Sequence, residues 1–317
     1  MKSKFFGIGF ALLTGSALAA PTAPTQPVTA IVGYAPGGAA DIVMRQLAAI
    51  MQPKFPAGLI VSNKPGAGGS TAVAGLVQAK PDGLQFAFVP NSNVSLSPQL
   101  VHLPYKNPDD LEHVLDVVSF SPILVVSSSS KYKSVSDLVA DAKKPDGNVS
   151  VGFPGVTTLS HFSVVSLARA SGANLIEVPF AGWGQGGPQL MGGQISAAVA
   201  QPSEAVPQIQ AGTLRALGSF SEQRQSGLPN IPTLKEQGYP VSFVARYLVV
   251  TTKGAPKDSV KYMHDAVKEA MDTKQFKDFV KERGMELTYR DGEASKQASW
   301  NDYRNFADLL KQIGPIK

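Results

Sequence analysis

The sequence contains no cysteine among its 317 residues. This absence excludes a disulfide framework, a cysteine nucleophile and a lipid anchor on a cysteine. Histidine is scarce, and the four histidines at positions 102, 113, 161 and 264 form no His-Glu-x-x-His motif and no pair at metal-ligand spacing. No Gly-x-Ser-x-Gly elbow is present. We therefore expect no catalytic residues, no metal and no cofactor.

Long apolar runs and charge of one sign are also lacking. With 43% hydrophobic and 17% charged residues, the chain can bury a core and is long enough for two domains. The longest internal apolar stretch, residues 244–252, is too short to span a bilayer and includes Arg246. The net charge of +5 comes from scattered residues without a basic stripe, so we expect no nucleic-acid partner.

The first nineteen residues have the pattern of a secretory signal peptide. Lys2 and Lys4 precede an apolar run at residues 5–13, and small residues follow up to Ala17-Leu18-Ala19. The run is too short to cross a membrane as a helix. The pattern predicts a signal peptide over residues 1–19, cleavage after Ala19, and a free, soluble, exported protein.

Apolar strand-like runs alternate with helix-like periodicity along most of the chain. Such alternation is typical of an α/β fold with a largely parallel sheet. We expect strands at 28–32, 59–61, 85–89, 149–152, 175–178, 195–200, 214–218 and 286–289. We expect helices at 39–51, 70–79, 135–143, 158–170, 205–210, 258–271, 274–283 and 294–310.

Two long extended stretches, residues 114–127 and 241–252, flank the middle α/β block. The simplest interpretation is two lobes joined by two strand crossovers, with the C-terminal part rejoining the first lobe. We assign residues 20–121 plus 245–317 to lobe 1 and residues 122–244 to lobe 2. A cleft between such lobes is a common place for a ligand.

One glycine pattern imitates a dinucleotide-binding motif. Gly182, Gly184 and Gly187 fit Gly-x-Gly-x-x-Gly, and Glu204 follows at a suitable distance. However, only about seven residues then remain before the next strand, whereas a crossover helix needs a dozen or more. We reject the dinucleotide interpretation on that ground, and because an exported protein is not expected to hold a nicotinamide cofactor. The glycine-rich run at 64–70 lacks the Gly-Lys-Ser/Thr of a Walker motif.

Two glycine-containing turns lead from a strand into a helix, at residues 34–41 and 154–161. Free N–H groups at a helix start favour an anion, and glycine lets a ligand approach the backbone. Thr157 or Thr158 can cap the second helix. The alternative for the first is a plain turn with Asp41 in the first helical turn. With one turn in each lobe, we expect the two turns to face each other across the cleft. That arrangement favours a binding site over two plain turns.

Several segments resemble the extracytoplasmic receptors of tripartite tricarboxylate transporters, the Bug or TctC-like family. They run in family order over nearly the whole mature chain. The matching segments are Pro36-Gly37-Gly38 with Asp41 and Arg45, then residues 63–69, 79–83, 178–182, 191–195, 209–217 and 231–238. No single segment would suffice for this resemblance.

The resemblance implies a periplasmic-binding-protein fold of the Venus-flytrap, type II-like kind. It implies a receptor that closes on a small organic mono- or dicarboxylate, aromatic acids included, and presents it to integral-membrane transporter subunits. The implied ligand-binding residues are Tyr34, Pro36, Gly37, Gly38, Asp41, Asn91, Ser92, Asn93, Thr157, Thr158, His161, Ala181, Gly182, Trp183, Gln201 and Glu204.

Three residues can each be interpreted in two ways, as a ligand contact or as a structural residue. Trp183 can stack on a planar acid or pack as a rim residue. Arg246 can bind a carboxylate or serve as a structural ion-pair partner near the hinge, which we favour. Glu204 can repel a second carboxylate and favour an amine or hydroxyl, or simply stand as an acid at a helix start, which we also favour.

The sequence predicts a monomeric, non-enzymatic receptor in the periplasm without a lipid anchor. Two rivals stay open. One is a receptor that presents the same carboxylate to a membrane signalling protein, and the other is a secreted α/β hydrolase, for which no nucleophile-base pair is visible.

Overall fold

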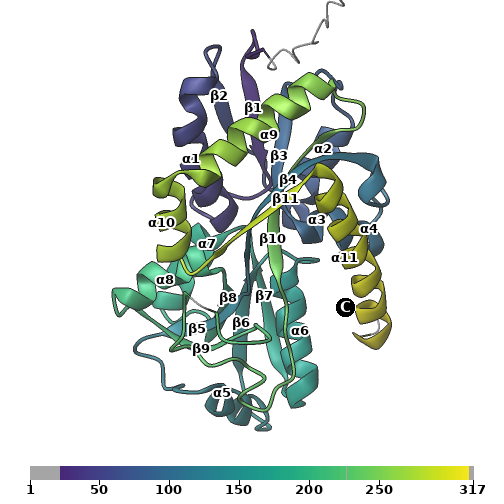
Figure 1. Cartoon of the computed structure of the whole chain (residues 1–317). Coiled ribbons are helices and arrows are strands. Elements are labelled where there is room, and N and C mark those ends of the chain that lie inside the picture. The colour runs from purple at the N-terminus through teal and green to yellow at the C-terminus, as the bar shows by residue number, and fades with distance from the viewer. Residues whose placement is uncertain (1–21, 226, 314–317) are drawn as a thin grey trace, which may run out of the picture.

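The computed structural model describes residues 22–225 and 227–313. The segment predicted as a signal peptide, residues 1–19, lies outside the described residues. Figure 1 shows two lobes, each built on a β-sheet with helices packed against it. This architecture confirms the two-lobed α/β fold predicted from the sequence.

The first sheet has six strands in the order β11-β4-β10-β3-β1-β2. They are β1 (Val28–Val32), β2 (Leu59–Asn63), β3 (Gln85–Pro90), β4 (Leu111–Phe120), β10 (Ala245–Thr252) and β11 (Glu286–Asp291). β1 runs parallel to β2 and β3, whereas β10 lies antiparallel between β3 and β4. Strands β1, β2, β3 and β4 run in one direction, as expected for a largely parallel sheet. β10 enters from the other lobe in the reverse direction, and β11 is also antiparallel to β4.

Alternate residues of these strands feed two apolar cores, one on each face of the sheet, as the two-residue period of a strand requires. Phe86, Phe88 and Val249 face a core that α1 and α9 cover. Ala87 and Leu248 face the other core, which α2 covers. The helices of this lobe are α1 (Ala39–Met51), α2 (Ser70–Val77), α3 (Asn91–Ser95), α4 (Ser97–Leu100), α9 (Lys257–Asp272), α10 (Lys274–Glu282) and α11 (Gly292–Ile313).

The second sheet has five strands in the order β7-β6-β8-β5-β9. Its strands are β5 (Ile123–Ser127), β6 (Val149–Pro154), β7 (Leu175–Phe180), β8 (Ala197–Ala200) and β9 (Leu214–Ser219), and its helices are α5 (Val135–Ala142), α6 (Leu159–Ser171), α7 (Trp183–Met191) and α8 (Pro202–Gln210). β5 follows β4 directly and lies antiparallel to β8 and β9. The expected extended stretch at 114–127 is therefore two strands, one in each sheet.

Helix α7 contradicts the sequence argument about the glycine pattern at 182–187. A nine-residue helix fits between β7 and β8 although it contains Pro188. Glycines make this possible, since a Cβ on Gly186 would lie 2.4 Å from the ring of Phe180. Close packing of the helix on that ring outweighs the poor helix propensity of glycine and proline. The premise that no crossover helix fits was therefore wrong.

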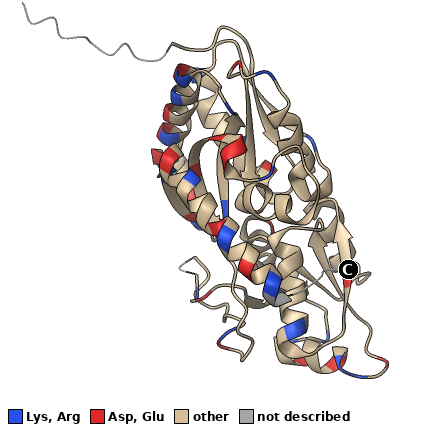
Figure 2. Cartoon of the chain, turned by 90° about the vertical axis from the view of Figure 1, so that its right-hand side faces the viewer, with Lys and Arg blue, Asp and Glu red and all other residues tan. Residues whose placement is uncertain are grey.

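The exposed helices carry both signs of charge. Figure 2 shows Lys and Arg interspersed with Asp and Glu on one face of the molecule. On α9 and α10, lysines pair with aspartates one turn further on, as in Lys261–Asp265 and Lys274–Asp278. Among the described residues, no helix has the length and apolar character needed to cross a membrane.

Candidate functional site

A buried cavity lies where the two lobes meet. Lobe 1 lines it with the start of α1, the ends of β3 and β4, and the beginning of β10, and lobe 2 with the starts of α6 and α8 and the loop after β7. The lining residues are Tyr34, Gly38, Ala39, Ala40, Pro90, Ser92, Phe120, Pro154, Thr158, Leu159, Ser160, Gly182, Gln201, Glu204, Ala245 and Tyr247. Space for water amounts to about 30 Å³, so the lobes are closed.

Closure of the lobes depends on small residues. A Cβ on Gly155 of lobe 2 would lie 2.8 Å from the Cα of Gly68 in lobe 1, so the two backbones touch. A Cβ on Gly182 would lie 3.3 Å from the Cβ of Ala35. These contacts leave no room for larger side chains between the two lobes.

The loop before α1 is braced by Asp41. Its carboxylate accepts hydrogen bonds from Arg45 Nε at 2.9 Å, Asn63 Nδ2 at 2.8 Å and Gly37 N at 2.9 Å. Burial alone would raise the pKa of Asp41, but these hydrogen bonds outweigh it and hold the pKa below its ordinary value. Asp41 thus fixes the turn, and its oxygen atoms point to lobe 1 partners.

The start of α1 receives a carboxylate from the opposite lobe. Glu204 Oε1 accepts a hydrogen bond from Ala39 N at 2.8 Å, and Oε2 accepts one from Gln201 N at 3.0 Å. Glu204 is therefore an acid at the start of α8, as favoured from the sequence, and also a link between the lobes. Burial raises its pKa to about 7, although the two backbone hydrogen bonds oppose the shift.

This raised pKa predicts a pH effect on stability. Between pH 4.5 and 7 the folded protein keeps a proton on Glu204 that the unfolded chain has released, so the free energy of unfolding falls as pH rises. His113 acts in the opposite sense, since burial lowers its pKa to about 4. Tyr34 and Tyr247, which face Glu204, stay neutral because burial raises their pKa values.

Comparison with Glu204→Gln isolates the contribution of Glu204. We expect the free energy of unfolding of the variant, relative to the unsubstituted protein, to rise by roughly 3 kcal/mol from pH 4.5 to 7.5. Urea denaturation at several pH values measures this difference. A difference that stays constant across the range would contradict a buried, protonated Glu204.

The start of α6 is held by Thr158, one of the two predicted caps. Its Oγ1 accepts from His161 N at 3.3 Å and donates to Gly155 O at 2.9 Å. The His161 ring stacks on Phe153, with its Nε2 2.7 Å from Glu177 Oε2 and its Nδ1 accepting from Thr157 N at 3.3 Å. The structure thus brings Thr158 to the cavity and turns the His161 side chain away from it.

Only one of three predicted polar residues after β3 lines the cavity. Ser92 does so, whereas Asn91 Nδ2 donates to Asp302 Oδ2 at 2.8 Å and Asn93 Nδ2 donates to Gly68 O at 2.8 Å. Asn91 and Asn93 position the backbone around Ser92.

Of the remaining predicted residues, Tyr34, Gly38, Gly182 and Gln201 line the cavity. Trp183 packs edge-on against Phe180 in the apolar core of lobe 2. The other residues, Pro36, Gly37 and Ala181, are exposed at the outer edge of the closed interface.

Sequence reasoning did not single out the apolar lining. Phe120 and Tyr247 come from the two strands that cross between lobes, and their rings meet edge-on at 5.0 Å. The sequence did contain a signal for these two residues, because both lie in the extended stretches predicted to cross between the lobes. Ser160 also lines the cavity and was not predicted from the sequence. Its Oγ accepts a hydrogen bond from Gln201 Nε2 at 2.8 Å, within lobe 2.

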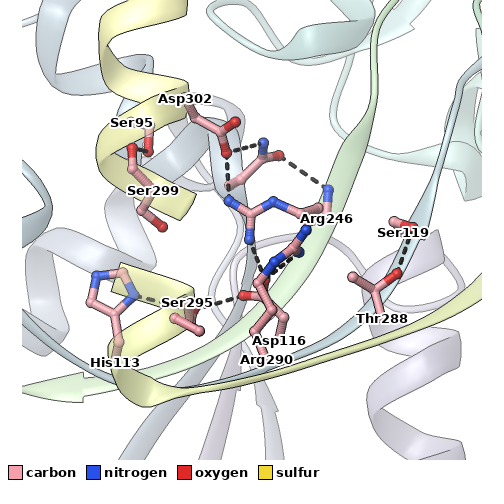
Figure 3. A network of polar contacts seen from close by, with 12 residues as sticks. Ser95, His113, Asp116, Ser119, Arg246, Thr288, Arg290, Ser295, Ser299 and Asp302 are labelled. Atoms are coloured by element: carbon pink, nitrogen blue, oxygen red, sulfur yellow. Dashed lines mark hydrogen bonds and ion pairs between the residues drawn. The ribbon is translucent and has the colours of Figure 1, made fainter. Parts of the chain in front are cut away.

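Arg246 is a structural ion-pair partner, as favoured from the sequence. Figure 3 shows its guanidinium between Asp116 and Asp302, with Arg290 and Ser295 also bound to Asp116. Burial alone would lower the pKa of Arg246, but the two carboxylates raise it above its ordinary value. Its charge is satisfied inside lobe 1.

This network joins strands β4, β10 and β11 to helix α11. It also reaches the residue next to Ser92, because Asn91 Oδ1 accepts from Arg246 N at 3.2 Å. Among the described residues, no cluster of His, Asp or Glu could hold a metal ion. The arrangement suits binding of a small polar molecule between lobes.

Comparison with known proteins identifies one receptor family, and it also identifies proteins of similar sequence and fold. The family described as "Tripartite tricarboxylate transporter family receptor" matches residues 43–314. A UPF0065 protein from the gbd 5' region of Cupriavidus necator is 29% identical over 294 residues, covering 93% of this chain and 89% of that protein. The periplasmic binding protein BugD has a TM-score of 0.86 at 27% identity, covering 92% and 98% of the two chains. MatC from Rhodopseudomonas palustris with bound malate has a TM-score of 0.85 at 24% identity, covering 90% and 99%, and shares the fold.

Proposed function

This chain belongs to the tripartite tricarboxylate transporter receptor family, and from that premise we propose that it is a periplasmic solute receptor. It binds a small organic carboxylate between its lobes and delivers it to integral-membrane transporter subunits. The same proposal includes an export signal at residues 1–19 and a monomeric protein.

One observation supports the proposal most directly. The starts of two thirteen-residue helices, α1 of lobe 1 and α6 of lobe 2, meet at a single buried cavity. Helix starts stabilise anions through free N–H groups and the helix dipole. Glu204 of lobe 2 already binds the start of α1, so the ligand anion is placed at the start of α6. Because the cavity is lined by both lobes, a ligand that contacts both favours the closed state over the open one.

We expect the purified protein to gain thermal stability with a carboxylate ligand. A ligand at 100 times its dissociation constant adds about 2.7 kcal/mol to the free energy of unfolding, which raises Tm by several degrees. A thermal-shift screen of mono- and dicarboxylates, aromatic acids included, measures this gain. Each hit is compared with its amide and with sodium chloride at equal ionic strength. If no carboxylate exceeds these controls, the proposal is wrong.

The transport step needs a separate test in cells. Deleting the gene is expected to reduce uptake of the carboxylate that gave the largest Tm shift. Unchanged uptake together with a lost transcriptional response to that carboxylate would instead favour a receptor for a membrane sensor.

A further inference from the structure

The cavity proposed to take an anion has one acidic side chain and no basic one among its described lining residues. Among the described residues that line it, Glu204 is the one acid, and no lysine, arginine or histidine is present. Its side chain is buried, with 6% exposure. Above the raised pKa of Glu204, a ligand therefore meets a carboxylate already in place and no cationic side chain to balance a second one.

Glu204 also occupies the position at which α1 would hold an anion. Ala39 is the first residue of α1, and its N–H donates to Glu204 Oε1 at 2.8 Å. A ligand carboxylate at this helix start would lie beside Glu204 in a buried place, where like charges repel strongly. The Glu204 carboxylate accepts from Ala39 N and Gln201 N, whereas the opposite helix start, at Leu159 of α6, is capped by Thr158 of its own lobe.

The two helix starts that line the cavity therefore differ in what they favour. When the lobes open to admit a ligand, the helix dipole and the Ser160 hydroxyl favour a carboxylate at the start of α6. The end near α1 accepts a hydrogen-bond donor, because the Glu204 carboxylate has lone pairs beyond the two N–H groups that it already binds. A hydroxyl or an ammonium group satisfies that requirement.

Building on the proposed function, we propose that Glu204 is a specificity-determining residue. It makes the site select ligands with one carboxylate and a hydrogen-bond donor at the opposite end, and reject dicarboxylates of the same length. The selection follows from charge, since the rejected and accepted ligands have similar size and share one end.

The test uses three matched ligand types of four to six carbons. At four carbons they are 4-aminobutyrate, butyrate and succinate, with an ammonium, a methyl or a carboxylate at the variable end. Isothermal titration at pH 8, where Glu204 is ionised, measures their affinities. We expect the unsubstituted protein to prefer the amino acid over the dicarboxylate. Glu204→Gln is expected to move this ratio toward the dicarboxylate by roughly tenfold, or about 1.4 kcal/mol.

Two further variants separate charge from other effects. Glu177→Gln removes a carboxylate of lobe 2 that binds His161 outside the cavity lining, so the ratio should not change. Glu204→Asp keeps the charge with a shorter reach, and it should keep most of the selectivity even if Glu204→Gln folds poorly.

The outcomes distinguish the two proposals. If carboxylates bind but Glu204→Gln leaves the ratio unchanged, or the unsubstituted protein prefers succinate, the specificity role is wrong while the receptor function stands. If no carboxylate binds either protein, the proposed function fails and the specificity role fails with it.

Discussion

Replacing Asp116 by alanine is expected to lower the free energy of unfolding by about 3–5 kcal/mol. Asp116 is fully buried and binds the guanidinium of Arg246, Arg290 Nη1 at 2.9 Å and Ser295 Oγ at 2.7 Å. Its removal leaves a buried arginine with one carboxylate instead of two, and desolvation of the guanidinium is no longer compensated. Urea denaturation at pH 7 measures the loss.

The control is an ion pair on the surface. Glu222 and Lys235 pair with more than half of each side chain exposed, so Glu222→Ala should lower the free energy of unfolding far less than Asp116→Ala. Equal losses for the two variants would contradict the role given to the buried network. Asp116→Asn should also weaken ligand binding, because the network positions Asn91, the neighbour of Ser92 in the cavity wall.

Replacing Gly182 by leucine is expected to weaken carboxylate binding by more than about 100-fold. Gly182 has an extended backbone, with φ of 169°, so leucine fits there without backbone strain. Its side chain would enter the contact with Ala35 of the other lobe, where even a Cβ lies at 3.3 Å. The lobes then cannot close, and the ligand loses the contacts of one lobe.

Two measurements check this expectation. Titration of a carboxylate identified by thermal shift gives the affinity, and small-angle scattering reports whether the lobes approach when it is added. Gly75→Leu is the matched control, since this exposed glycine of α2 has open space around its Cβ position. Gly182→Leu should unfold at a normal temperature without ligand. Tight binding by this variant would show that closure at Gly182 is not required.

Local signals predicted the helices that form the site. The apolar spacing of α1 and the cap at Thr158 act within a few residues, and both helices lie where the sequence places them to within one residue. Helix α7 was missed because its stability comes from packing against Phe180, which propensity does not register.

The directions of polar side chains could not be predicted in the same way. A residue's place on a loop is a local property, but the partner that orients it lies far along the chain. Asn91 turns toward Asp302, and Glu204 crosses to Ala39, 165 residues earlier. The first pairing exists only once lobe 1 has formed, and the second only once the lobes have closed. The pattern of residues in one segment therefore cannot predict either pairing.

The position of β10 has a consequence for the order of folding. It lies in the middle of the first sheet, between β3 and β4, yet it is made after every strand of the second sheet. The strands of the second sheet, β5 to β9, lie in one continuous stretch of chain, so their pairing needs no segment outside that stretch. Lobe 1 must wait for a central strand that pairs with distant partners, a slow step that leaves the edges of β3 and β4 unpaired meanwhile. The connectivity of the chain thus favours completion of the second lobe before the first.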